Sequence, residues 1–267
     1  MGIVNRRAVL AAFDEQIRRA PSSGGRGAQV ERDPGMVRVF GGEDGWSGVV
    51  WSDLQEHDVD RAIADSVARF SRFRRPWEWK LYSYDSPADL PDRLLAAGLV
   101  PEPVESLLMA YVDGVDQEVW PPAGVALREV NEAAGIDALV AVHDEVFGGD
   151  HSAFGRDLLG RLTGGADVPV PVPVPVLAVA DGRPVAGARV EFHPGTEFAS
   201  LWGGGTVRDW RGRGVFRSLV AYRARLAAAR GYRYLQVDAS ADSRPILLRL
   251  GFVELATTTP YIHPGHS

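Results

Sequence analysis

The stretch that decides the fold reads Gly203-Gly204-Gly205-Thr206-Val207-Arg208-Asp209-Trp210-Arg211-Gly212-Arg213-Gly214-Val215-Phe216. Apolar residues continue from it at helical spacing, at Leu219, Tyr222 and Leu226, so the pattern predicts a strand, a glycine- and arginine-rich loop and then a helix. The first N–H groups of a helix have no partner within the helix, and together with the helix dipole they attract anions. Gly212 and Gly214 would let a pyrophosphate approach the backbone closely. The stretch therefore predicts a phosphate-binding loop.

The segment after residue 124 alternates strand and helix patterns around this loop. In order, it predicts a strand at 125–130, helices at 134–147 and 154–162, strands at 176–180, 184–192 and 198–204, a helix at 214–230, a strand at 232–238, a helix at 243–250 and a last strand at 252–258. Proline alternates with valine over 168–176, which predicts a stiff polyproline II spacer on the surface.

The first 118 residues carry a shorter series of the same kind. They predict helices at 6–19, 58–73 and 88–97 and strands at 37–40, 46–51, 77–84 and 107–112. The segment Trp120-Pro121-Pro122-Ala123-Gly124 is the predicted linker, because consecutive prolines fit neither a helix interior nor a central strand. We therefore expect two domains, residues 1–118 and 124–267.

The two parts share a short stretch of sequence. Leu94-Leu95-Ala96-Ala97-Gly98-Leu99-Val100 matches Leu247-Leu248-Arg249-Leu250-Gly251-Phe252-Val253 without a gap, and the same offset pairs Asp85 with Asp238. This agreement predicts that one unit was duplicated. Where the second unit has its phosphate loop, the first has Glu56-His57-Asp58-Val59-Asp60-Arg61, whose carboxylates repel a pyrophosphate. Only the second unit is expected to bind one.

Composition narrows the function classes. With 45% apolar residues, 24% charged residues and no run of 18 apolar residues, the chain is expected to be a soluble, cytoplasmic protein without a membrane partner. The absence of cysteine excludes disulfides, thiolate metal sites and a cysteine nucleophile, and no metal site is expected. A net charge of −6 and a pI near 5.6 argue against nucleic acid as the partner.

From residue 125 to the C-terminus, the chain resembles the GNAT superfamily of N-acetyltransferases. The loop fits two of the three positions of the family's acetyl-CoA motif, as Arg211-x-x-Gly214-x-Phe216, with Phe216 in place of a small residue. The order of strands and helices and the segment Leu250-Gly251-Phe252 are also similar to the family. The resemblance implies an α/β (α+β) GNAT fold, a mixed and mostly antiparallel central sheet flanked by helices, duplicated here with a degenerate N-terminal unit.

The resemblance also implies a reaction and a cofactor site. Acetyl-CoA is the expected co-substrate, and its acetyl group would pass to a primary amine of a small-molecule or peptide acceptor. The residues expected to bind coenzyme A are Gly205, Thr206, Val207, Arg211, Gly212, Arg213, Gly214, Val215 and Phe216. The acceptor is expected in a groove between the units, lined by residues 125–162 and by Trp77, Trp79 and Tyr82, which are also typical of a core. A homodimer is left open.

Two other functions fit the same loop. Gly212-x-Gly214 before a helix and Asp238 at the end of the next strand are typical of a dinucleotide-binding unit, but Arg217 stands where its third glycine would be. A non-catalytic module that binds acyl-CoA without turnover is the second alternative.

The chemical step needs a group that takes a proton from the amine, because an alkylamine with a pKa of about 10.4 is protonated at neutral pH. Asp238 and Glu191 are the preferred catalytic bases, since each ends a predicted strand beside the cofactor groove. The other candidates are His193, Glu197 and the run His143-Asp144-Glu145. The family's frequent tyrosine acid is replaced by Leu247, which leaves Tyr261, Ser240, Ser243 or solvent as the proton donor.

Overall fold

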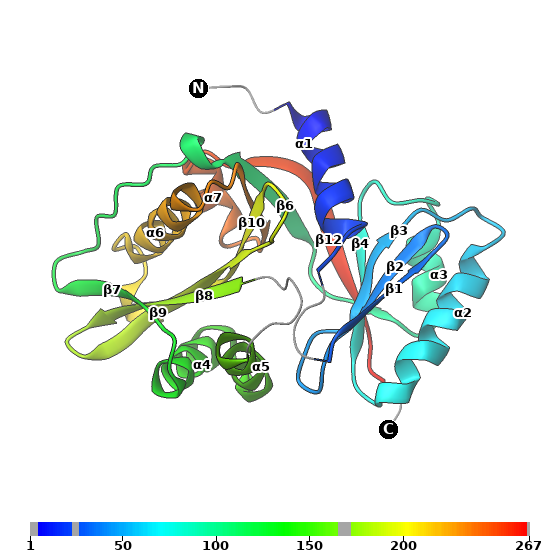
Figure 1. The fold of residues 1–267 in the computed structure, drawn as a ribbon, viewed down its shortest axis with the longest axis horizontal. Coiled ribbons are helices and arrows are strands. Elements are labelled where there is room, and N and C mark those ends of the chain that lie inside the picture. Colours follow the sequence, from blue (N-terminus) through cyan, green and yellow to red (C-terminus); the bar gives the residue numbers. More distant parts are fainter. Residues whose placement is uncertain (1–4, 23–26, 165–171, 266–267) are drawn as a thin grey trace.

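One continuous sheet runs through the whole molecule (Figure 1). The structure is a computed structural model and describes residues 5–22, 27–164 and 172–265. Within these residues the sheet has twelve strands in the order β1-β2-β3-β4-β12-β6-β11-β10-β9-β8-β7, and β5 pairs with β12 beside this path. Every pairing is antiparallel except β3–β4 and β10–β11. The predicted mixed, mostly antiparallel α/β fold is confirmed.

The strands are β1 (Gln29–Asp33), β2 (Met36–Phe40), β3 (Gly48–Ser52), β4 (Trp77–Tyr82), β5 (Val100–Pro101), β6 (Glu105–Tyr111), β7 (Val125–Glu129), β8 (Val172–Ala180), β9 (Arg183–Phe192), β10 (Phe198–Thr206), β11 (Tyr234–Ala239) and β12 (Val253–His263). The helices are α1 (Arg6–Phe13), α2 (Val59–Phe70), α3 (Leu90–Ala96), α4 (Ala133–Phe147), α5 (Ser152–Thr163), α6 (Val215–Ala229) and α7 (Arg244–Arg249). Short helical turns are η1 (Asp14–Arg18), η2 (Ser71–Phe73), η3 (Val112–Gly114) and η4 (Arg208–Trp210).

The same series of elements occurs twice along the chain. The first half runs β2-β3-α2-β4-α3-β6 and the second runs β9-β10-α6-β11-α7-β12. In each series the single parallel pair joins the strands on either side of the long helix, β3 with β4 and β10 with β11. The two halves are therefore built alike, as the sequence match between α3 and α7 suggested.

The two halves exchange their last strands. β6 follows the elements of the first half but pairs with β11, and β12 follows the elements of the second half but pairs with β4. β6 and β12 also pair with each other and thereby join the two half-sheets. We call β6 and β12 the exchanged strands.

Each half has its own core, and helix α1 packs over the junction between them. In the first half, Trp79 is fully buried and Trp77 stacks on Phe70 at 4.4 Å and on His263 of β12 at 5.5 Å. Phe13 of α1 touches Tyr82 at 6.0 Å between ring centroids and Phe198 at 5.9 Å, so it contacts both halves. Figure 1 shows α1 beside β12 and β4.

The polyproline tract was predicted wrongly where the structure describes it. Residues 172–176 belong to β8, which pairs with β9 along its length, whereas residues 168–171 lie outside the described residues. The carbonyl of Pro175 accepts a hydrogen bond from Val130 on the β7 side. In an antiparallel strand the N–H and C=O of one residue point the same way. The backbone nitrogens of Pro173 and Pro175, which carry no hydrogen, therefore point away from β9. The hydrogen bonds between β8 and β9 do not need a donor at these two residues.

The sequence patterns also missed one whole strand and the C-terminal end of another. β1 was not predicted, and β12 continues to His263, beyond the predicted end at residue 258. None of the helices in the described parts of the chain is both long and apolar enough to cross a membrane.

The exchange predicts that neither half folds alone. A fragment of residues 124–267 lacks β6, whose Leu108 and Ala110 are buried in its core, and a fragment of residues 1–118 lacks Tyr261 and His263 of β12. Each fragment is expected to show no cooperative unfolding, and the two together are expected to recover it, measured by near-UV circular dichroism during denaturant titration. Cooperative unfolding of either fragment by itself would contradict the exchange.

Candidate active site

The predicted phosphate loop ends in an open helix N-terminus. Gly212 and Gly214 have φ angles of +71° and +91°, and nothing lies within 4 Å of the point where a Cβ would stand at either residue. The first backbone N–H that bonds back into the helix is that of Ser218, to the carbonyl of Gly214. In the described chain, the N–H groups of residues 212–217 have no backbone acceptor. This turn therefore presents several unpaired donors to an anion.

The loop is held in place from the end of β10. Arg211 Nε donates a 3.0 Å hydrogen bond to the carbonyl oxygen of Thr206. Val207 and Val215, on either side of the loop, are both buried in one core cluster. The hydroxyl of Thr206 is buried and has no hydrogen-bond partner in the described structure.

Strands β10 and β11 separate beside the loop. They pair only from Phe198 to Ser200 on β10, and β10 then continues to Thr206 beside β9 but without β11. A bulge between Trp202 and Gly205 breaks the pairing with β9 at the same level. The resulting gap, which we call the strand split, runs from the phosphate loop into the middle of the sheet.

Glycine at position 204 makes room for the unusual Phe216. A Cβ at residue 204 would stand 3.0 Å from the ring of Phe216, on the α6 side of the strand. A Cβ at residue 205 would instead meet Val146 and Phe147 of α4 at 2.8 and 3.0 Å, so α4 and α6 cover opposite faces of β10. The ring of Phe216 packs against the core beneath the sheet.

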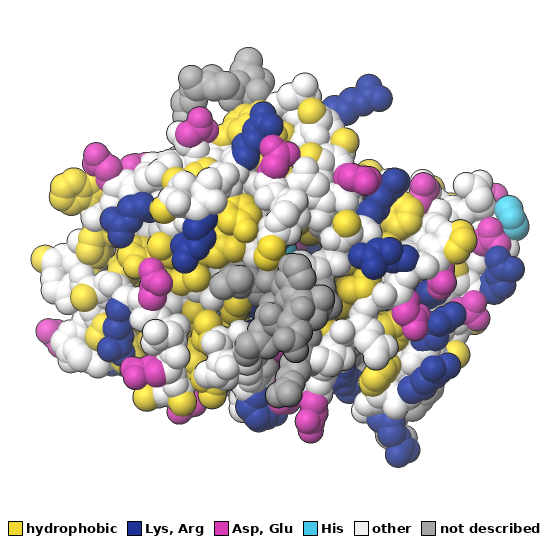
Figure 2. Space-filling model, viewed as in Figure 1, with side chains coloured by type: hydrophobic (Ala, Val, Ile, Leu, Met, Phe, Trp, Pro, Cys, Tyr) yellow, Lys and Arg dark blue, Asp and Glu magenta, His cyan; other side chains and the backbone are white. Residues whose placement is uncertain are grey.

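A cavity of about 640 Å³ lies between the two halves, in front of the strand split. Ser200 and Trp202 of β10 and Gln236 and Asp238 of β11, on the two sides of the split, all line it. Its charged and imidazole side chains are Arg18, Asp44, Glu78, Lys80, Glu102, Glu105, Asp157, Arg161, Arg189, Glu191, His193 and Asp238. On the outer face seen in Figure 2, acidic and basic side chains of the described residues are interspersed with hydrophobic ones.

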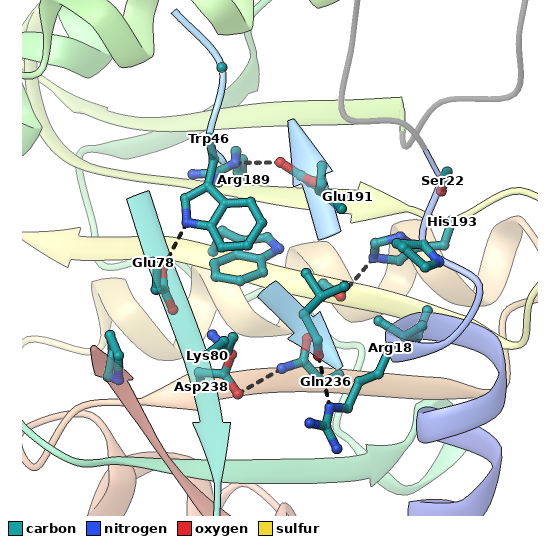
Figure 3. Close-up of a pocket in the computed structure, with 18 of the residues that line it drawn as sticks. Arg18, Ser22, Trp46, Glu78, Lys80, Arg189, Glu191, His193, Gln236 and Asp238 are labelled. Atoms are coloured by element: carbon teal, nitrogen blue, oxygen red, sulfur yellow. Dashed lines mark hydrogen bonds and ion pairs between the residues drawn. The ribbon is translucent and has the colours of Figure 1, made fainter. Parts of the chain in front are cut away.

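A buried ion pair joins the two halves across this cavity. Lys80 Nζ of β4 lies 2.6 Å from Asp238 Oδ2 of β11, and Gln236 Nε2 donates to Asp238 Oδ1 at 3.0 Å (Figure 3). Burial alone would lower the pKa of Lys80, but the carboxylate of Asp238 raises it well above its usual value. Lys80 is therefore charged at neutral pH, and Asp238 is held by two donors.

Glu191 is fixed by two arginines. Its Oε1 lies 2.8 Å from Arg189 Nε and 3.1 Å from Arg161 Nη1. Burial works to raise the pKa of Glu191, but the two guanidinium groups outweigh it and lower the pKa to about 2. This setting favours a role for Glu191 in holding the arginines. Its neighbour His193 lies 2.8 Å from Ser200 Oγ through Nε2, and burial lowers the pKa of His193.

Two other carboxyl groups of the cavity have raised pKa values. Burial raises the pKa of Glu105 to about 7, against the opposing effect of Lys80, and the charges of Asp238 and Glu78 add to the rise. Burial likewise raises the pKa of Glu78, again against Lys80. Leu107 pairs directly with Asp238, so Glu105, two residues earlier on β6, is on the same face and roughly 7–8 Å away by Cβ.

The cavity brings together three of the acid–base candidates named from the sequence: Asp238, Glu191 and His193. Four others lie elsewhere: His143 bonds to the carbonyl of Gly203, Asp144 to His151, Glu145 to Arg183 and Glu197 to Arg233.

None of the replacements named for the absent tyrosine acid belongs to the described lining of the cavity. Leu247 and Tyr261 are packed in hydrophobic cores, and Ser240 and Ser243 bond to each other before α7. Of the predicted groove aromatics, Tyr82 lines the cavity, whereas Trp77 and Trp79 are core residues.

Sequence reasoning named Tyr82 of β4 but missed Glu78 and Lys80 of the same strand and Glu105 of β6. Glu78, Lys80 and Tyr82 alternate with the buried residues Trp77, Trp79 and Leu81, so their strand is covered on both faces. Lys80 is also the only lysine of the chain. The signal in the sequence was the charged residue at every second position of a strand whose other face is apolar. This pattern could have predicted that Glu78 and Lys80 belong to the site.

The Lys80–Asp238 pair predicts a strong coupling in stability. Loss of one partner leaves a buried charge, so Lys80→Met and Asp238→Asn are each expected to lower the free energy of unfolding by about 3–5 kcal/mol. In the double variant, the second substitution is expected to cost much less than it does alone. The exposed pair Arg183–Glu145 is the control, and Arg183→Met is expected to cost under about 1 kcal/mol. Additive losses in urea titrations of the Lys80 and Asp238 variants would disprove the coupling.

The geometry of the site gives no sign of a metal centre, since no three His, Asp or Glu side chains of the described residues are grouped to hold an ion. No model of a known protein family matches the sequence, and no curated protein matches it either.

Solved structures nevertheless share the fold. A GCN5-related N-acetyltransferase from Kribbella flavida superposes with a TM-score of 0.69 at 22% identity, over 98% of this chain and 96% of its own. A tandem GNAT protein from the clavulanic acid biosynthesis pathway gives a TM-score of 0.59 at 16% identity, over 99% of this chain and 95% of its own. A GCN5-related N-acetyltransferase from Sphaerobacter thermophilus gives a TM-score of 0.56 at 15% identity, over 90% of this chain and 78% of its own. The chain therefore has the fold of the GCN5-related N-acetyltransferases, in a duplicated form that covers almost its whole length.

Proposed function

We propose that this chain is an N-acetyltransferase that moves the acetyl group of acetyl-CoA to a primary amine. The observation that carries the proposal is the continuity of three features: the open N-terminus of α6, the strand split and the cavity. An anion site, a break in strand pairing and a cavity with charged side chains in its lining, in that order, suit a long cofactor with a phosphate end and a reactive end. The cytoplasmic location and a homodimer stay predictions.

The residues present fit a coenzyme A group. Gly212 and Gly214 leave open space for a pyrophosphate, which the N–H groups of residues 212–216 and the side chains of Arg211 and Arg213 would hold. The backbone of residues 205–207 would hold the pantetheine arm, and the unpaired hydroxyl of Thr206 offers one more polar contact there. When bound, the group supplies an acetyl thioester that an amine can attack.

The cavity residues would bind the amine and accept its proton. A general base works best when its pKa is near the working pH, and the pKa of Glu105 is about 7. Asp238 and Glu191 remain candidates from the sequence, but Lys80 already contacts Asp238, and the guanidinium groups of Arg189 and Arg161 hold the pKa of Glu191 well below its usual value. We therefore place Glu105 first as the proton acceptor, with Asp238 beside it. Burial of the chamber between the halves would keep water from the thioester.

The cofactor site is tested by Gly214→Glu. A carboxylate at the loop is expected to abolish acetyl-CoA binding in calorimetry, because it would occupy and repel the phosphate position. Gly231→Glu is the matched control: Gly231 also has a positive φ, +75°, and open space, but it lies at the far end of α6. Undiminished binding by a folded Gly214→Glu variant would refute the site, and tighter binding of a nicotinamide dinucleotide would favour the alternative.

The proton acceptor is tested by pH profiles. Because Glu105 must lose its proton to act, kcat/KM is expected to rise with pH through about 7, and Glu105→Gln should lose this rise and about 100-fold or more in kcat. Asp238→Asn and Glu191→Gln, compared in the same assay, should keep the rise. Retention of the rate and profile by Glu105→Gln, with coenzyme A affinity preserved, would show that another group accepts the proton.

A further inference from the structure

The cavity holds more carboxylates than its cations can pair. Each basic side chain of the lining has its own acidic partner: Arg18 pairs with Asp85, Lys80 with Asp238, and Arg161 and Arg189 with Glu191. Asp44 is bound by Arg156 and Asp157 by Arg161. Three carboxyl groups remain without an ion pair in the described structure, namely Glu78, Glu102 and Glu105.

Glu78 is the member of this group that is built into the wall. Its Oε2 accepts a 2.7 Å hydrogen bond from the indole N–H of Trp46, which fixes the orientation of the carboxylate (Figure 3). Its Oε1 is buried and has no hydrogen-bond partner in the described structure. A buried carboxylate oxygen without a donor is costly, and an ammonium group bound at Glu78 would remove that cost when the side chain turns this oxygen toward the cavity.

We infer that the acceptor carries two amines: an uncharged one that faces the strand split beside Asp238 and Glu105, and a protonated one that binds Glu78 and Glu102. The inference rests on the proposed function and names its substrate class, an aliphatic diamine or longer polyamine. Glu102 lies at the open side of the cavity and is close enough to Glu78 for their charges to interact. A second ammonium group would also offset the excess negative charge of the lining.

The strand geometry sets the distance between the two amines. Glu78 and Lys80 are on the same face of β4, two residues or about 7 Å apart. Lys80 Nζ in turn touches Asp238 beside the split. The two nitrogens should therefore be separated by a chain of about four or five carbons.

The experiment compares 1,4-diaminobutane with butylamine, which has the same chain and one amine. With acetyl-CoA and a thiol-release assay, kcat/KM is expected to be roughly 10- to 100-fold higher for the diamine, since a hydrogen bond to a charged group contributes about that much. Glu78→Gln keeps the shape of the side chain and should bring the ratio of the two kcat/KM values to within about threefold of one. Glu118→Gln, an exposed glutamate outside the cavity, is the matched control and should keep the wild-type ratio.

Calorimetry with 1,4-diaminobutane on the coenzyme A-loaded protein separates this inference from the proposed function. Diamine binding that is weaker in Glu78→Gln but unchanged in Glu118→Gln supports the diamine site. If this binding is seen and neither amine is acetylated, the enzyme function alone is refuted. Equal kcat/KM values for the two amines, or a ratio unchanged by Glu78→Gln, would overturn the diamine site and leave the acetyltransferase standing. If neither amine is acetylated and the diamine does not bind, the diamine site is overturned as well.

Discussion

The exchange of β6 and β12 is the constraint on which the rest of the structure depends. Because each half completes its sheet with the other's last strand, β4 and β11 belong to one sheet, with only the exchanged strands between them. Three strand spacings in a flat sheet amount to about 14 Å, yet Lys80 and Asp238 are in contact at 2.6 Å. The sheet must therefore bend at the exchanged strands, and the cavity occupies the inside of this bend. A chamber made in this way belongs to both halves, and the first half contributes to it without an open phosphate loop of its own.

The chemistry of the chamber follows from where charges are paired. The arginines that line the cavity and the single lysine are all bound by carboxylates. They therefore hold the lining in place, and their charge is offset before it could attract an anion. Among the described charged residues of the lining, those without an ion pair are acidic, and burial raises the pKa of Glu78 and Glu105. Such a chamber disfavours anionic acceptors and suits an amine, whose proton has to be removed before attack. The proposed anion site lies at the α6 N-terminus, at the other end of the strand split, so in this proposal the two ends of the site have opposite electrostatic character.

Features that depend on local sequence were predictable, and those that depend on long-range pairing were not. Glycines 212 and 214 and the apolar spacing of α6 are local signals that predict the loop, and the order of strands and helices after residue 124 was needed as well to predict the fold. The exchange of β6 and β12 has no local signal, because a strand pattern predicts that a strand forms but not which strand it pairs with. For the same reason Glu78, Lys80 and Glu105 were missed, since their strands come from the half that lacks the loop. The strand at Pro173 and Pro175 was missed because alternating prolines are typical of polyproline II. The pattern does not show that their missing N–H groups point away from β9, beyond the last residue of β8 that pairs with β7.

A crystal structure of the protein with bound coenzyme A would test this arrangement of the site most directly. We expect the pyrophosphate to contact the N–H groups of residues 212–216, the pantetheine arm to follow residues 205–207 into the strand split, and the thiol to open into the cavity near Asp238 and Glu105. Binding of coenzyme A in the first half, or a thiol directed away from the cavity, would contradict it.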